Sequence, residues 1–334
     1  MTMLPDVTTH SMLSRFGRCP RAAMYAYYDK LRPRSIRRPL RMGVWFHYLL
    51  EAHYSGNDWR AVHEKLTLQH EDSFFDEEVG DIPNSCERLM RSYLWHYQLE
   101  KKYGWKILDV EVKLVAVWPD GSEYWCRFDL LVEDANGDIW IVDHKLRTRM
   151  PGVYMYLLES QNLAYIWAAW KNKIKVKGFI WNVVRMKPPV IPRVLKNNTL
   201  SKRKIMTDYP TLAKVIRDNE MDPRDYADDL RRLKAVYWRP DKTQESPFFF
   251  RHALDADPEI IRRKIKEMYK TRKRMARYNF EDRDAVERVV DRTCETHCDY
   301  TLLCSTELIG GNADNVRRLN YREVDPLDHY KLHS

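Results

Sequence analysis

The sequence of 334 residues lacks the features that would assign it to several broad classes at once. It has no long uninterrupted apolar run, so we expect no membrane span. Its N-terminus lacks the apolar core of a signal peptide, and no internal repeat or low-complexity tract is present. We therefore expect an intracellular protein, long enough for one large domain or for a core with substantial insertions.

Acidic residues are too few to balance the basic ones, and the formal net charge is +9. The excess is clustered. Residues 15 to 41 hold nine Lys or Arg against one acid, Asp29. Residues 261 to 278 hold nine more against one acid, Glu267. With 20 Tyr and 11 Trp available for stacking, these blocks favour a polyanionic partner, nucleic acid above all. The alternative is that they form solvated helix faces.

The stretch from residue 127 to residue 147 predicts a β-hairpin. Residues 128–133 and 138–143 are rich in strand-forming side chains, and Ala135-Asn136-Gly137 between them is a turn signal. One loop that fits comprises these three residues, a type I turn closed by Gly137 in the left-handed conformation. A two-residue Asn-Gly loop is the alternative, and it shifts the register by one residue.

The choice of loop decides where three charged side chains lie. With the longer loop Asp129 opposes Asp143, and both share a face with Lys145. The shorter loop places Asp129 on the other face. Two carboxylates close together repel unless a cation lies between them, and hard oxygen ligands suit Mg²⁺ or Mn²⁺. The alternative is two acids at a strand edge beside a solvated lysine.

The spacing of these residues resembles a known family. Asp129, thirteen further residues and then Asp143-His144-Lys145 behind an apolar run resemble the PD-(D/E)XK nuclease core. More narrowly, IVDHK resembles the hydrophobic-D-Y-K-T motif of the RecB-like exonuclease branch, with His144 in place of Tyr and Leu146 in place of Thr. The resemblance implies an α/β fold in which helices flank a mixed central sheet.

Residues 42 to 54 read as a helix on which Gly43, His47 and Glu51 share one face. The glycine permits close approach. A single helical histidine is often only a packed or surface residue, but G-x-x-x-H-x-x-L-E resembles the family's metal-histidine helix. The resemblance therefore implies that His47 is a metal ligand.

Two further motifs fit the family. Gln161 and Tyr165, four residues apart on a predicted helix over 152–170, match the Q-x-x-x-Y motif that follows the lysine in the RecB branch. The resemblance implies that they hydrogen-bond or stack with a DNA strand near the scissile phosphate. Glu111, in a predicted strand over 107–118, lies where the family often has an acid; a strand-surface carboxylate is the alternative.

Six cysteines in an intracellular chain argue against a disulfide scaffold. Three are grouped near the C-terminus, and a predicted helix over 11–31 supplies a fourth. By resemblance to the iron–sulfur subset of these nucleases, four thiolates bind a [4Fe–4S] cluster: Cys19, Cys294, Cys298 and Cys304. The alternatives are structural Zn²⁺ on four Cys, or on three Cys and His297, and plain buried cysteines. Cys86 and Cys126 remain as core residues.

The resemblance divides a single RecB-like nuclease domain, residues 1–334, into parts. They are a catalytic core at 105–185, an insert or flap at 186–245, and a Cys-cluster cap in which residues 1–31 join 290–306.

By resemblance the function is a metal-dependent DNA exonuclease that acts on single strands or duplex ends in recombination, repair or phage replication. His47, Asp129, Asp143 and the backbone carbonyl of His144 would bind Mg²⁺ or Mn²⁺, and Lys145 would orient the attacking water. An endonuclease or a CRISPR-adaptation trimming nuclease would use the same site. A non-catalytic DNA-binding subunit is a rival of another class. The expected partners are DNA and a recombination or replication protein, in the cytoplasm of a bacterial or phage-infected cell.

Overall fold

The computed structural model describes residues 6–69, 80–97, 105–149, 152–236 and 246–330. The ends of the predicted domain at 1–334 and the last part of the predicted insert, residues 237–245, lie outside the described residues. No helix in these described ranges combines the length and apolar character that a membrane crossing requires.

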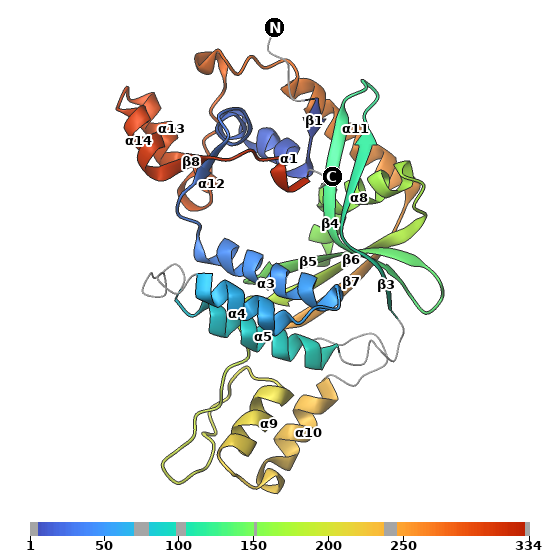
Figure 1. Cartoon of the computed structure of the whole chain (residues 1–334), viewed down its shortest axis with the longest axis vertical. Coiled ribbons are helices and arrows are strands. Elements are labelled where there is room, and N and C mark those ends of the chain that lie inside the picture. The colour runs from blue at the N-terminus through green and yellow to red at the C-terminus, as the bar shows by residue number, and fades with distance from the viewer. Residues whose placement is uncertain (1–5, 70–79, 98–104, 150–151, 237–245, 331–334) are drawn as a thin grey trace.

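A mixed six-stranded sheet forms the centre of the fold (Figure 1). Its order is β1-β4-β5-β6-β7, and β3 pairs with β4. The strands are β1 (Val7–Thr8), β3 (Lys106–Val117), β4 (Glu123–Glu133), β5 (Ile139–Arg147), β6 (Val176–Arg185) and β7 (Phe249–Asp255). The β5–β6 and β1–β4 pairs are parallel and the others are antiparallel. The predicted fold class, a mixed α/β sheet flanked by helices, is confirmed.

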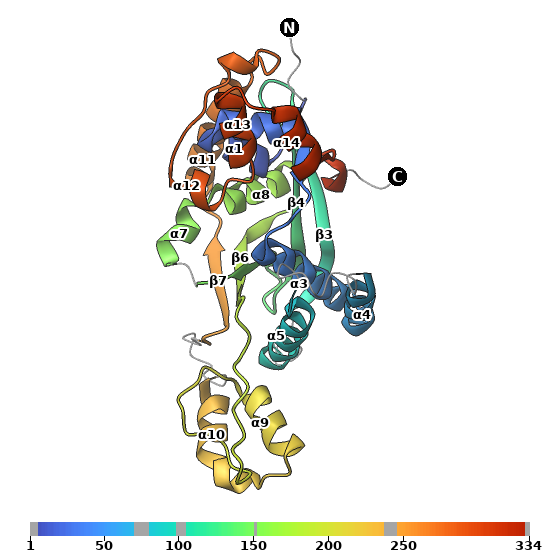
Figure 2. The same ribbon diagram turned by 90° about the vertical axis from the view of Figure 1, so that its left-hand side faces the viewer.

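Helices cover both faces of this sheet (Figures 1 and 2). One face carries α1 (His10–Arg18), α8 (Ser160–Lys171) and α11 (Pro258–Met275). The other carries α3 (Arg38–Tyr54) and α5 (Ile82–His96), with α4 (Trp59–Gln69) packed on them. Strand β5 is apolar on both sides, with Ile141 in the cluster on the α8 face and Val142 in a cluster on the opposite face. A central strand covered by helices on both faces has this near-continuous apolar character.

The turn between β4 and β5 is the three-residue loop. The Asp134 N–H donates to the Asp138 carbonyl at 2.9 Å, and the Gly137 N–H donates to the Asp134 carbonyl at 3.0 Å. Gly137 has φ +82°, which its lack of a side chain permits. Along the hairpin Leu130 opposes Val142. The register predicted for the longer loop is confirmed, and the two-residue alternative is wrong.

Two predicted helices are interrupted. The predicted helix over 11–31 ends at Arg18 and resumes at Pro20, because a residue before proline is disfavoured in helical conformation and Cys19 is extended. The continuation consists of α2 (Pro20–Ala23) and a π-helical turn, Met24–Tyr28. The predicted helix over 152–170 is divided at Glu159 into α7 (Val153–Leu158) and α8.

Residues 186–236 leave the sheet after β6 and fold into a small helical unit. It contains α9 (Tyr209–Asp218), a 3-10 turn (Pro223–Tyr226) and α10 (Ala227–Val236). Leu212, Ile216, Met221 and Leu233 form its own apolar cluster. Figures 1 and 2 show this unit at the far end of the molecule from the N- and C-terminal segments. The ring of Tyr209 stacks on Trp95 of α5 at 5.0 Å and joins the unit to the core.

Segments from the two ends of the chain pack together into a cap (Figure 1). Strand β2 (Leu31–Pro33) pairs antiparallel with β8 (Tyr321–Glu323). The other C-terminal elements are α12 (Arg292–Thr296), α13 (Thr301–Leu308), α14 (Ala313–Asn320) and two 3-10 turns, Arg283–Ala285 and Asp328–Tyr330. On α13 the Glu307 carboxylate accepts from the Tyr25 hydroxyl at 2.5 Å and from Arg283 at 3.0 Å. These charge-assisted hydrogen bonds hold the end segments together.

Candidate active site

The two carboxylates of the hairpin lie where β4 and β5 separate. The strands pair from the loop as far as Leu130 and Val142. At the next position the Asp129 carboxylate accepts the backbone N–H of His144 at 2.5 Å. The side chain thus takes the place of a ladder bond between the strands. This bond fixes Asp129 beside the Asp143-His144-Lys145 segment.

His47 reaches this carboxylate from helix α3. Its Nδ1 lies 3.4 Å from Asp129 Oδ1. Burial opposes the charge on both groups, but each stabilises the charged form of the other. The pKa of His47 is therefore raised and the pKa of Asp129 is lowered. The structure brings the predicted histidine and the first predicted aspartate together.

Asp143 and Lys145 form an ion pair on β5. Asp143 is only 3% exposed. Burial raises its pKa to about 6; Lys145 opposes this shift, while the charge of Asp129 adds to it. The Lys145 ammonium also lies 5.5 Å from the centre of the Trp181 ring on β6. The acids and the amine therefore meet in one buried site, in which the two carboxylates repel each other.

The ring of His144 lies beside the His47 ring, with 6.2 Å between the two ring centroids. Its Nδ1 lies 2.6 Å from Asn182 Nδ2, and the ring stacks on Tyr54 at 5.4 Å. Because an amide NH₂ only donates, Nδ1 is the acceptor and Nε2 carries the proton of the neutral ring. Burial lowers the pKa of His144 to about 4, which keeps the ring neutral. Behind it, Arg251 Nε donates to Asn182 Oδ1 at 3.1 Å. The predicted role of the His144 backbone carbonyl as a metal ligand stays a prediction.

Gln161 and Tyr165 pair with each other on α8. Gln161 Nε2 donates to the Tyr165 hydroxyl at 2.7 Å. The Tyr165 ring is 4% exposed and packs against Phe128 and Phe179, at 5.8 and 6.3 Å. The ring is thus part of the core and is not free to stack on a base. The stacking role predicted for it is wrong, whereas hydrogen bonding through Gln161 stays a prediction.

The chemistry of the donors suits a hard divalent cation. The half-buried Asp129 carboxylate lies close enough to the buried Asp143 carboxylate to raise its pKa, and Asp143 Oδ2 has the Lys145 ammonium as its partner. A divalent cation held by both carboxylates would relieve their repulsion. Among the described residues, however, no group of three or more His, Cys, Asp or Glu side chains is gathered closely enough to hold a metal ion as it stands. The Lys145 ammonium is the cation beside Asp143 in this arrangement.

Asp129 and Asp143-His144-Lys145 thus stand on neighbouring strands of a mixed sheet. A family model of the PD-(D/E)XK nuclease superfamily matches residues 8–305. The chain belongs to this superfamily.

Two solved structures are partly similar to this PD-(D/E)XK protein. The protein SSO0001 is 12% identical, with 66% of this chain and 78% of that chain covered and a TM-score of 0.27. The "Putative exonuclease" of Eubacterium rectale is 13% identical, with 72% and 85% covered and a TM-score of 0.38. With sequence identities and TM-scores this low, neither structure can be used to assign a role to any residue of this chain. No curated protein matches the chain.

The tertiary fold brings two other residues, His10 and Glu111, near the site of this PD-(D/E)XK protein. His10, the first residue of α1, contacts Ser160 Oγ through Nε2 at 2.9 Å. Its pKa is lowered to about 4, by burial and then by the nearby Lys145. The sequence analysis does not find His10, because no local pattern links it to the hairpin.

Glu111 on β3 is the second such residue. It has φ +56°, which is rare for a residue with a side chain, and it pairs with Arg127 Nε at 2.9 Å. Burial, followed by the charge of Asp129, raises its pKa to about 7. This places Glu111 close enough to Asp129 to feel its charge, and a role for Glu111 near the site stays a prediction.

Three of the four predicted cluster ligands line one cavity in the cap, and the fourth, Cys304, lies near Cys19. Cys19, Cys294 and Cys298 line one cavity of about 60 Å³, together with His297. Burial and the nearby Cys19 raise the pKa of Cys304. All four are free thiols. Cys86 and Cys126 are buried, as predicted, with no solvent-facing role.

Proposed function

We propose that this PD-(D/E)XK protein is a divalent-metal-dependent DNA exonuclease of the RecB-like branch. The observation that carries the proposal is the convergence of His47, Asp129, Asp143 and Lys145 from a helix and two strands. The role in recombination, repair or phage replication, and the location in a bacterial or phage-infected cytoplasm, follow from resemblance and belong to the same proposal.

The residues that would hold Mg²⁺ or Mn²⁺ are His47, Asp129, Asp143 and the His144 carbonyl. When bound, such an ion acts as a Lewis acid on the phosphate and lowers the pKa of water. His144 supplies rigidity, because its ring is fixed by Asn182 and Tyr54 while its N–H holds Asp129. The His47 imidazole must lose its proton before Nδ1 can act as a ligand.

Lys145 would act on the attacking water and on the phosphate. Its ammonium lies between Asp143 and the face of Trp181, which limits its movement. From there it can donate hydrogen bonds to a phosphate oxygen or orient water for in-line attack. The Gln161 amide, already oriented by the Tyr165 hydroxyl, would donate to the DNA strand near the scissile phosphate.

In the cap we propose a [4Fe–4S] cluster on Cys19, Cys294, Cys298 and Cys304. Free thiols from both chain ends that line or adjoin one small cavity support a four-thiolate site. Structural Zn²⁺ is the second candidate, and the presence of His297 in the same lining favours it. Either group would hold together segments that are far apart in the sequence, with no part in hydrolysis.

The deciding experiment is hydrolysis of end-labelled linear DNA and of a closed circle in Mn²⁺. Release of nucleotides from the linear DNA, with the circle left intact, is expected for an exonuclease. Asp143→Ala and Lys145→Ala should abolish release. Asp138→Asn, on the same hairpin but exposed, is the matched control and should keep activity. Full activity in either site variant would refute the assignment, and cleavage of the circle would make the protein an endonuclease.

A further inference from the structure

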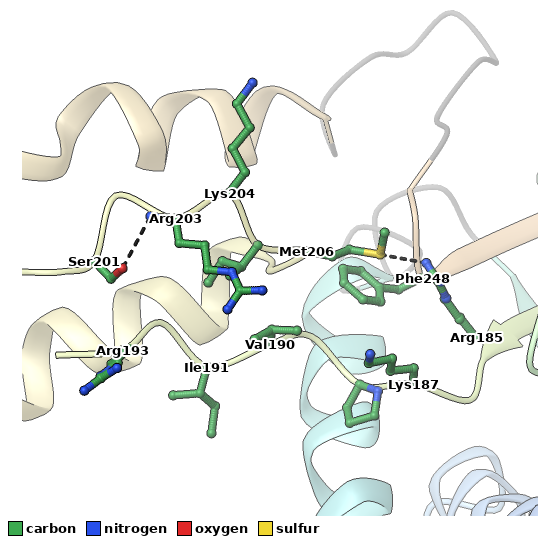
Figure 3. Close-up of a pocket in the computed structure, with 12 residues that line it drawn as sticks. Arg185, Lys187, Val190, Ile191, Arg193, Ser201, Arg203, Lys204, Met206 and Phe248 are labelled. Carbon is green, nitrogen blue, oxygen red and sulfur yellow. Dashed lines mark hydrogen bonds between the residues drawn. The ribbon is translucent and has the colours of Figure 1, made fainter.

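A basic hollow lies where the chain passes from strand β6 into the helical insert (Figure 3). The hollow has a volume of about 510 Å³, within the range of ligand sites. It lies between residues 185–193, which leave the sheet, and residues 201–206, which return beside them. Five cationic side chains line it: Arg185, Lys187, Arg193, Arg203 and Lys204.

The positive charge of the hollow is not compensated. No acidic residue lines it, and within the described part of the chain none of the five cations forms an ion pair. Arg185 contacts only a weak acceptor there, the thioether of Met206 (Figure 3). On helix α10 of the same insert, by contrast, Arg231 and Arg232 each pair with an aspartate. Five unpaired cations around one concave surface create a strong positive potential that favours an anionic ligand.

The hollow begins where the strand that carries the candidate active site ends. Arg147 of β5 opposes Arg185 of β6, and the Met186 N–H donates to the Arg147 carbonyl at 2.8 Å. Lys145 lies two residues earlier on the same face of β5, which is about 7 Å along a strand. A chain of phosphates held at Lys145 would therefore meet Arg185 and Lys187 within a few nucleotides.

Apolar side chains stand between these cations. Ile191 is 53% exposed and Met206 is 44% exposed, although both are large and hydrophobic. A groove of cations that follows the phosphate backbone is typical of sites for single-stranded nucleic acid. The exposed apolar side chains between these cations offer surface to the unstacked bases and sugars of a single strand. In a duplex the base faces are stacked inside and cannot use such surface.

We propose that this hollow binds the phosphate backbone of single-stranded DNA as it continues past the scissile phosphate. The inference rests on the proposed nuclease function and extends it with a second contact outside the catalytic cluster. Lys187 and Arg203 are its central contacts, because Figure 3 shows them on the two segments that face each other across the hollow. The helical insert thereby acts as a guide for the substrate strand.

The first test measures binding with no divalent ion added, so that hydrolysis does not interfere. Fluorescent single strands are titrated with the full-length protein at several salt concentrations. In Lys187→Ala/Arg203→Ala the slope of log K against log salt should fall by about 1.4, since each phosphate contact contributes about 0.7. The matched control is Lys196→Ala/Lys234→Ala, which removes two exposed cations of the insert outside the hollow; its slope should stay that of the wild type. Equal slopes in the two variants would overturn the proposal, as would a loss confined to duplex DNA.

The second test measures hydrolysis in Mn²⁺ on strands of about 4 and about 16 nucleotides, a span that covers typical single-strand sites. In the wild type and in the control variant, kcat/KM should rise with strand length. In Lys187→Ala/Arg203→Ala this rise should be lost, and a preserved rise would contradict the inference. If the wild type cleaves nothing, the proposed function fails, while the salt experiment still decides whether the hollow binds DNA.

Discussion

His47 Nδ1 and Asp129 Oδ1 lie 3.4 Å apart, and they come from a helix and a strand on different sides of the candidate active site. The contact raises the pKa of His47 and lowers that of Asp129, against the effect of burial. A proton on His47 Nδ1 would therefore have to leave before this nitrogen could bind a metal ion. Proton and metal should compete for this site.

Metal affinity should accordingly depend on pH. Below about 6 the Asp143 carboxyl becomes protonated, because its pKa is raised to about 6, and His47 is protonated as well. The affinity for Mn²⁺, measured by electron paramagnetic resonance, should weaken about tenfold per pH unit for each proton displaced. His47→Gln should weaken binding and lower the pH slope by about one proton. Affinity that does not change with pH would exclude both residues as ligands.

The pH dependence of stability should report on His10. Its folded-state pKa is about 4 against an ordinary 6.5, so the unfolded chain binds the proton more readily. Neutral His10 therefore makes its full contribution to the free energy of unfolding above about pH 6.5, and this contribution is lost as the pH falls toward 4. Between pH 7.5 and pH 5 the wild type should lose about 1–2 kcal/mol more free energy of unfolding than His10→Gln, whose amide can still contact Ser160. Urea titrations at the two pH values measure this difference, and identical losses would show that His10 titrates normally.

The hairpin could be predicted from sequence because its determinants are local. The turn signal at Ala135-Asn136-Gly137 and the alternation on both sides predict the two strands but leave two loops open. The hydrogen bonds of the three-residue loop decide between them and set which acids share a face. The point at which the two strands separate, at Asp129, could not be predicted in this way, because it depends on a hydrogen bond between the Asp129 carboxylate and the His144 N–H. The interruption at Cys19 could have been predicted from Pro20, since a proline restricts the residue before it.

The other surprises come from tertiary packing. Helix α9 was missed although Asp208 caps it, since the Pro-rich stretch before it reads as a loop. His10 reaches the site through the fold, and no neighbour in sequence signals this. Gly43 was expected to permit close approach, but a Cβ added there would meet nothing within 4 Å. No described residue packs closely on Gly43, so the role of this glycine stays a prediction.

Gly178 on β6 is the glycine that the fold does require. A Cβ there would lie 2.1 Å from the Leu254 carbonyl oxygen and 2.8 Å from the Trp140 ring. Gly178→Ala should therefore destabilise the protein by about 2–4 kcal/mol, because the adjacent strand must move. Gly43→Ala, in the interior of helix α3, is the matched control and should stabilise by about 0.5–1 kcal/mol. Equal unfolding midpoints in urea for the two variants would contradict the close packing of β6 against β7.

The metal of the cap can be identified from the protein as purified without oxygen. A [4Fe–4S] cluster should give a brown protein with broad visible absorbance, whereas Zn²⁺ gives a colourless one. Cys19→Ser should at least halve the iron content, because one of four ligands is lost. Cys86→Ala changes a buried cysteine outside the cap and should leave the iron content unchanged.

If the protein contains zinc instead, His297→Ala decides between the two zinc ligand sets. Loss of zinc favours three Cys and His297, and retention of zinc favours four Cys. Unchanged metal content in Cys19→Ser would remove the N-terminal helix from the site, and the cap would then be held by Glu307 and its arginine partners.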